Sequence, residues 1–264
     1  MLRDQNEVEH LSVIKAIVIK DSQCARSSKK SGGGVKSGFS TRAITSLAYV
    51  DYLRSCGCDI GSNTFFQSPQ TACVDTTRPS LVTIGNNCTF LENFVLLTHD
   101  NVTRCLGRVF HEFLPSSGAV TIGNNVYFAR NCTVLKGVTI GDNCIIGLGS
   151  VVTKDIPANS VAVGTPARVV CTLEAYYEKR KKESLEEALE LARVIYRKTG
   201  KRPTVEQMYE EFPLWMEGDQ EDERLKFSVA MQTAGFHDIW KRQHKAPFRS
   251  FEEFVDKALE SVEE

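Results

Sequence analysis

The sequence predicts a mainly β fold, a triangular prism of stacked parallel strands, and two observations support this. Six apolar residues stand six apart without a slip: Ile122, Phe128, Val134, Ile140, Ile146 and Val152. The position after them is mostly Gly or Ala: Gly123, Ala129, Gly141 and Gly147. Such a hexapeptide repeat makes a short strand and a turn, and it buries its apolar side only when the next coil stacks on it. With three faces per coil, Ile122 returns above itself at Ile140.

A second inward position completes each repeat. It lies four residues after each apolar anchor and carries small to medium side chains: Val126, Cys132, Val138, Cys144, Ser150 and Ile156. The spacing continues upstream at Ile84, Phe90 and Leu96, and the pair Ile60-Gly61 opens a further coil. Residues 101–119 break the pattern and are predicted to form a loop outside the prism, where insertions in repeat arrays often line the working surface.

Three regions follow from these patterns. Residues 1–57 form an N-terminal segment, with a flexible Ser, Gly and Lys-rich linker over 21–40 and a helix over 41–56. Residues 58–170 form the repeat domain, in which only six residues after Val120 are charged. Residues 171–264 are predicted to be α-helical, because Ser184 with Glu187, Thr204 with Gln207 and Ser250 with Glu253 have the spacing of capping boxes.

Composition excludes several classes of partner. A net charge of −1 provides no basic field for nucleic acid. No apolar run approaches the ~20 residues of a membrane helix, and acidic residues precede the short apolar stretch at 11–19, which is the wrong flank for a signal peptide. Nine cysteines without a C-x-x-C pair signal no metal site. Cys88, Cys132 and Cys144 fall at inward positions, and free thiols of this kind predict a cytoplasmic protein.

His99 is the strongest candidate for chemistry. It lies in LLTHD, where a regular coil gives way to the loop, so a rigid scaffold would hold a partly exposed imidazole. Its ordinary pKa near 6.5 suits proton transfer at neutral pH. By itself, a lone His of this kind is more often structural than catalytic.

The stretch from Ile122 to Val170, together with LLTHD, resembles the hexapeptide-repeat O-acetyltransferases, which include galactoside and maltose acetyltransferases and capsule or lipopolysaccharide O-acetyltransferases. The resemblance implies a left-handed parallel β-helix, a homotrimer with sites between subunits, and acetyl transfer from acetyl-CoA to a hydroxyl of a sugar or polysaccharide. It implies His99 as general base. No metal is implied.

The remaining site residues also come from this resemblance. Asp75 is the best match for a polar residue that holds the acceptor, and Asp100 and Glu112 are candidates for orienting His99 or contacting the acceptor. Cofactor positions are predicted at Ala129, Arg130, Gly147, Leu148, Thr153 and Arg168. Leu148 departs from the small residue usual in I-G-A-G-S, and Phe128-Ala129-Arg130 departs from I-G-x, which puts ordinary CoA geometry in doubt.

Three other functions compete with this interpretation. A serine or nucleotide-sugar N-acetyltransferase would use the same prism, although the serine enzymes carry a large helical domain ahead of it. A non-catalytic scaffold would need neither His99 nor the closing T-P-A-R. A zinc-dependent carbonic anhydrase requires three His ligands, and the repeat region has two, His99 and His111.

Overall fold

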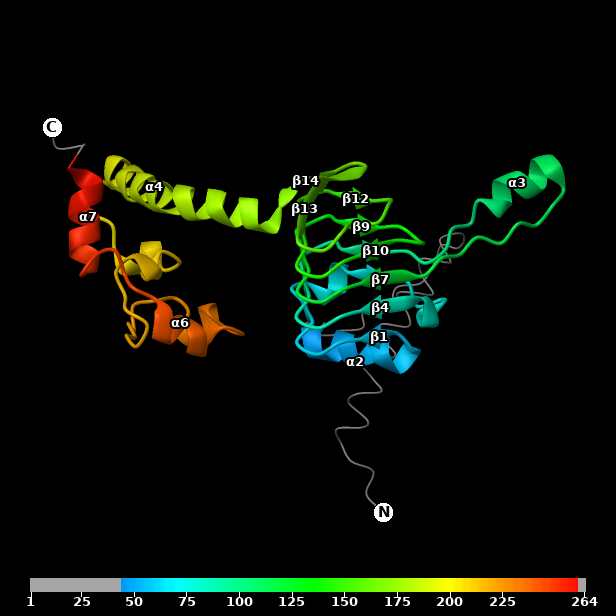
Figure 1. The fold of residues 1–264 in the computed structure, drawn as a ribbon, viewed down its shortest axis with the longest axis horizontal. Helices are drawn as coiled ribbons and strands as arrows, with labels where there is room; N and C mark the ends of the chain where they lie inside the picture. The colour runs from blue at the N-terminus through cyan, green and yellow to red at the C-terminus, as the bar shows by residue number, and fades with distance from the viewer. Residues whose placement is uncertain (1–43, 261–264) are drawn as a thin grey trace, which may run out of the picture. The chain divides into compact units, whose positions relative to one another are not determined.

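The computed structural model describes residues 44–260, which form two compact units that divide between Tyr176 and Tyr177. The first unit contains the prism and the second is helical (Figure 1). The boundary therefore lies inside helix α4 (Leu173–Thr199), a few residues after the expected one. The predicted linker over 21–40 lies outside the described residues, as do the first residues of the predicted N-terminal helix.

The prism has three faces of parallel strands, which we name by their sheets. Sheet A contains β1 (Asp59–Ile60), β4 (Val82–Ile84), β7 (Val120–Ile122) and β10 (Thr139–Ile140). Sheet B contains β2 (Phe65–Phe66), β5 (Thr89–Phe90), β8 (Tyr127–Phe128), β11 (Ile145–Ile146), β13 (Ser160–Gly164) and β14 (Ala167–Thr172). Sheet C contains β3 (Cys73–Val74), β6 (Val95–Leu96), β9 (Thr133–Val134) and β12 (Val151–Val152).

The strand register confirms the predicted coil. Ile122 pairs with Ile140, Phe128 with Ile146, and Val134 with Val152, each eighteen residues on. The fold is a left-handed parallel β-helix, as the sequence predicted. At its end β14 pairs antiparallel with β13 and closes sheet B.

The interior of the prism is filled from both inward positions of the repeat. All six anchors and all six residues four positions later are at most 4 % exposed. The rings of Phe66, Phe90 and Phe128 stack in a column, with centroids 4.5 and 5.0 Å apart. Stacked aromatic pairs add stabilisation beyond the area that they bury, so this column ties three successive coils together.

The corner between sheets A and B explains the glycines after the anchors. A Cβ on Gly123 would lie 2.8 Å from the backbone nitrogen of Asp142 in the next coil, so only glycine fits. Two residues later Asn125 and Asn143 adopt left-handed φ angles of 54° and 57°, which Asn tolerates better than most residues. The Asn125 amide donates to the Asn143 side-chain oxygen at 2.9 Å, and this contact links the coils along the corner.

Helix α2 (Ser46–Cys56) packs on the first coil. Thr45 caps it by accepting a hydrogen bond from the Ala48 N–H, and Gly57 ends it with φ 103°. Tyr49 and Leu53 of this helix are buried, whereas Leu47 is 70 % exposed. The Tyr49 ring meets Phe66 edge-on at 5.0 Å, which turns the helix face toward the phenylalanine column.

Residues 97–119 leave the prism as an arm (Figure 1). The arm was expected to be a loop, but it carries helix α3 (Thr103–Phe110), which ends at His111 with a left-handed φ of 57°. At its base the two chain segments pair as a short antiparallel ribbon, with a bridge between His99 and Ser117. Two single 3₁₀ turns, η1 (Pro69–Thr71) and η2 (Pro79–Leu81), interrupt the early coils.

The second unit is helical, as predicted. After α4 come η3 (Val205–Met208), η4 (Phe212–Leu214), α5 (Val229–Gln232), α6 (His237–Gln243) and α7 (Phe251–Leu259). Thr204 with Gln207 forms a capping box, and Ser250 caps α7. The cap predicted at Ser184 is wrong, because Ser184 lies inside α4 and its hydroxyl donates to the Lys181 carbonyl. Within 44–260, no helix combines the length and the apolar character needed to cross a bilayer.

Candidate functional site

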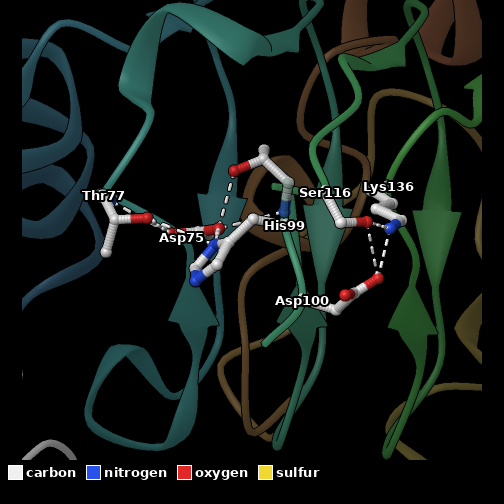
Figure 2. A network of polar contacts seen from close by, with 7 residues as sticks. Asp75, Thr77, His99, Asp100, Ser116 and Lys136 are labelled. Carbon is white, nitrogen blue, oxygen red and sulfur yellow. Dashed lines mark hydrogen bonds and ion pairs between the residues drawn. The ribbon is translucent and has the colours of Figure 1, made fainter. Parts of the chain in front are cut away.

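The corner between sheets C and A carries His99. Backbone hydrogen bonds stack the segments that follow the sheet C strands, from Asp75 to Leu96, from Leu97 to Val134, and from Leu135 to Val152. Asp75 therefore lies one coil below His99, and Lys136 lies one coil above it (Figure 2). Coiling brings together residues that are up to 61 positions apart in the sequence.

Asp75 and His99 form a close pair. Oδ2 of Asp75 is 2.5 Å from Nδ1 of His99, and the Asp75 side chain is 3 % exposed against 21 % for His99. The Thr98 N–H and hydroxyl donate to the same Oδ2, at 3.0 and 2.6 Å. The Thr77 N–H and hydroxyl donate to Oδ1, at 3.0 and 2.7 Å. Both carboxylate oxygens are thus occupied by donors (Figure 2).

This cluster of donors keeps Asp75 ionised although it is buried. Burial favours the neutral carboxyl, but the hydrogen bonds from Thr98, Thr77 and His99 outweigh it and hold the pKa of Asp75 far below its ordinary value. An ionised carboxylate only accepts hydrogen bonds, so Nδ1 of His99 carries the proton. Nε2 is then the basic nitrogen, and no hydrogen bond from the described residues reaches it. The pair has the arrangement of a general base with its orienting carboxylate.

The acidic residues differ in their contacts. Asp75, predicted to hold the acceptor, lies against the imidazole with both carboxylate oxygens occupied by donors. Asp100, predicted to orient His99 or contact the acceptor, instead binds Lys136 and Ser116. Its side chain is 35 % exposed, so an acceptor contact stays a prediction. Glu112 follows α3 in the arm and is exposed.

Most of the predicted cofactor residues gather at another corner, between sheets B and C. The Ala129 N–H donates to Ile146 O, the Gly147 N–H to Ala162 O, and the Gly149 N–H to Arg130 O, so their turns stack. Leu148 is 69 % exposed at this edge. Arg168 is also here, because it pairs with Val163 in the closing hairpin, and its side chain is exposed.

Two of the cofactor predictions change in detail. Arg130 already has a partner, since its Nε lies 2.6 Å from the Glu92 carboxylate. Thr153 follows β12 and so lies at the corner of His99, not with the others. The seven residues from Ala129 to Leu135, which include strand β9, separate the two corners.

Four polar residues of the network were not among the predicted site residues: Thr77, Thr98, Ser116 and Lys136. Counting the repeat would have found Lys136, because it stands two residues after the anchor Val134 and therefore at the corner where the sheet C strands end. The period does not predict the positions of Thr77 and Ser116, since both lie in irregular segments between coils.

Comparison with known proteins agrees with the repeat. Residues 119–154 match the family model described as bacterial transferase hexapeptide (six repeats). Galactoside O-acetyltransferase of Escherichia coli is 46 % identical over 94 residues, which are 34 % of this chain and 43 % of that protein. A putative acetyltransferase of Schizosaccharomyces pombe is 38 % identical over 95 residues, 36 % of this chain and 45 % of the relative. The chain spans less than half the length of these relatives.

The solved structures that the chain matches include two acetyltransferases. A maltose O-acetyltransferase from Clostridium difficile is 25 % identical, with 64 % of this chain and 89 % of that chain covered and a TM-score of 0.36. A galactoside acetyltransferase in complex with coenzyme A is 28 % identical, with 48 % and 70 % covered and a TM-score of 0.30.

Proposed function

Because this chain carries a hexapeptide-repeat domain of the bacterial transferase type, we propose that it transfers an acetyl group from acetyl-CoA to a hydroxyl of a sugar or polysaccharide. The observation that carries the proposal is the buried, ionised Asp75 against His99. A non-catalytic scaffold does not require a buried carboxylate that fixes one tautomer of a partly exposed imidazole. The names of the relatives support the acetyl group and the sugar.

His99 acts as the general base. Its Nε2 takes the proton of the acceptor hydroxyl while that oxygen attacks the thioester carbonyl. The new C–O ester bond forms as the C–S bond breaks, and the proton passes from Nε2 to the departing CoA sulfur. Asp75 is a positioning residue that holds the ring by Nδ1 and stabilises the positive charge gained by the imidazole. A positioned base of this kind contributes roughly 10²–10⁴-fold.

The exposed corner between sheets B and C would hold the cofactor. Gly149 leaves the backbone open beside Leu148, since it has a φ of 68° and nothing lies within 4 Å of a Cβ placed there. A Cβ on Gly147 would instead come within 2.5 Å of the Val163 side chain, so that glycine allows the turn to pack on the closing hairpin. Arg168 offers a bidentate group for a CoA phosphate. Ala129 and Arg130 lie at the same edge, and Thr153 would contact the cofactor from the corner of His99.

The separation of the two corners supports a homotrimer. His99 and most of the cofactor edge lie on opposite sides of sheet C, so one chain does not bring them to one thioester. Two copies that meet corner to corner would do so, and a cyclic arrangement of three uses the same contact at every interface. A cytoplasmic location, where acetyl-CoA is available and thiols stay reduced, belongs to the same proposal.

The replacement His99→Ala tests the function. Turnover, measured as CoA release with a panel of sugars, should fall by about 10²-fold or more, while acetyl-CoA binding by calorimetry stays unchanged. His237→Ala, in α6 of the helical unit, is the matched control and should keep full turnover. Unchanged turnover in the His99 variant, or a parent protein that binds no CoA, would contradict the proposal.

A further inference from the structure

Lys136 joins the prism to the base of the arm. Its Nζ contacts both Oδ2 of Asp100 and the Ser116 hydroxyl, and these two residues lie on the outgoing and returning segments of the arm (Figure 2). The Ser116 hydroxyl also donates to Asp100 at 3.0 Å. The ammonium therefore holds both segments of the ribbon at once. Hydrogen bonding from Lys136 is the main reason why the pKa of Asp100 lies below its ordinary value.

Backbone contacts hold the same ribbon close to the prism. The Gly118 N–H donates to Thr98 O at 2.9 Å, and the Asp100 N–H lies 3.4 Å from Ser116 O. A Cβ on Gly118 would come within 2.8 Å of the Gly137 nitrogen, so the returning segment lies directly on the turn that carries Lys136. A shift of that turn would therefore displace the base of the arm.

His99 lies between two anchored neighbours. On one side Thr98 is bound to Asp75 of the coil below, and on the other Asp100 is bound to Lys136 of the coil above. The backbone of His99 thus has a fixed position relative to Asp75, whose oxygen is 2.5 Å from the imidazole. A displacement of the reacting group by about 1 Å can cost 10²-fold in rate.

We infer that Lys136 is a positioning residue for the general base: its ammonium, through Asp100 and Ser116, holds the ribbon so that His99 stays on Asp75. This inference rests on the proposed function for its kinetic effect. The contact between His99 and Asp75 can also be followed without turnover, by NMR. Lys136 acts through the chain and does not need to touch either substrate.

Kinetics give the first test. Lys136→Met should lower kcat by about 10- to 100-fold with the affinity for acetyl-CoA and the KM for the acceptor nearly unchanged, and Lys136→Arg should recover most of the loss. Lys257→Met removes the same charge from a surface pair with Glu260 and should change nothing. The double variant Lys136→Met with Ser116→Ala should be no slower than Lys136→Met alone, because the two residues act as a unit. A raised acceptor KM with normal kcat, or full activity, would overturn the inference.

Proton NMR gives a test that needs no turnover. The proton between Nδ1 of His99 and Asp75 should give a far-downfield signal in the parent protein, identified by its loss in His99→Ala. It should weaken or disappear in Lys136→Met and persist in Lys257→Met. If no variant or parent shows acetyl transfer but this pattern is found, the proposed function fails and the positioning role stands. If the signal persists in Lys136→Met, the positioning role fails. Ser116→Ala, a milder change, should weaken it partially and serves if Lys136→Met does not fold.

Discussion

Replacing Asp75 by Asn tests the site most directly, because it keeps the shape of the side chain and removes its charge. The amide has one oxygen where the carboxylate has two, so one pair of donors loses its acceptor. The oxygen will stay with Thr98, which is buried and has no access to water, and the NH₂ group will face Thr77, which is exposed. We expect the loss of charged hydrogen bonds at this buried position to cost about 1–3 kcal/mol of unfolding free energy.

The effect on catalysis should be larger than the effect on folding. When the imidazole takes the acceptor's proton, it gains a positive charge whose centre lies roughly 4 Å from the carboxylate, and at an effective dielectric constant of about 20 the attraction is about 4 kcal/mol. Because the proton is only partly transferred in the transition state, kcat should fall by about 10²- to 10³-fold. Binding of acetyl-CoA should not change.

The assay combines CoA release at saturating acetyl-CoA with urea unfolding. Asp59→Asn is the control, since Asp59 is an exposed residue of β1, and it should shift the unfolding free energy by no more than about 0.5 kcal/mol. Wild-type kcat in Asp75→Asn would refute the reasoning. So would a similar kcat loss in Asp59→Asn.

Three other predictions follow from the structure. A His99→Ala chain and an Arg168→Ala chain that are unfolded and refolded together should regain part of the activity that each lacks, because each intact residue would serve a site between subunits. Light scattering should give the mass of three chains, and a fully active monomer would rule out the trimer. Arg168→Ala alone should weaken CoA binding by about 1.5–3 kcal/mol in calorimetry, and an unchanged affinity would remove Arg168 from the cofactor edge. The buried thiols of Cys88, Cys132 and Cys144, whose pKa values burial raises, should react with a thiol reagent only after unfolding, and rapid labelling of the native protein would contradict their placement.

The lowered pKa of Asp75 also predicts a pH dependence of stability. A depressed pKa in the folded state stabilises the protein above the ordinary Asp pKa near 3.9, and this stabilisation is lost as the pH falls from there toward the lowered value. The difference in unfolding free energy between the parent protein and Asp75→Asn should therefore shrink as the pH falls below about 4. A difference that continues to grow below about pH 4 would show that Asp75 is not held ionised.

The repeat by itself determined the prism. A six-residue period is a local property, and each anchor, from Ile122 to Val152, is buried inside the stack of coils. For the same reason the sequence placed the buried thiols and the tight corner glycines. His99 could be singled out because it stands where the period stops.

Only the tertiary structure decided what surrounds His99. Asp75, Thr98 and Lys136 lie at one corner because three coils stack there, and the 3₁₀ turns and the arm make the chain length of each coil irregular. In the regular repeats, counting residues from the anchors predicts the corner at which a residue lies. It does not predict which side chain each carboxylate contacts. Whether Asp75 or Asp100 faces the imidazole depends on side-chain directions that arise from packing, and packing is set by contacts between coils that no local period records.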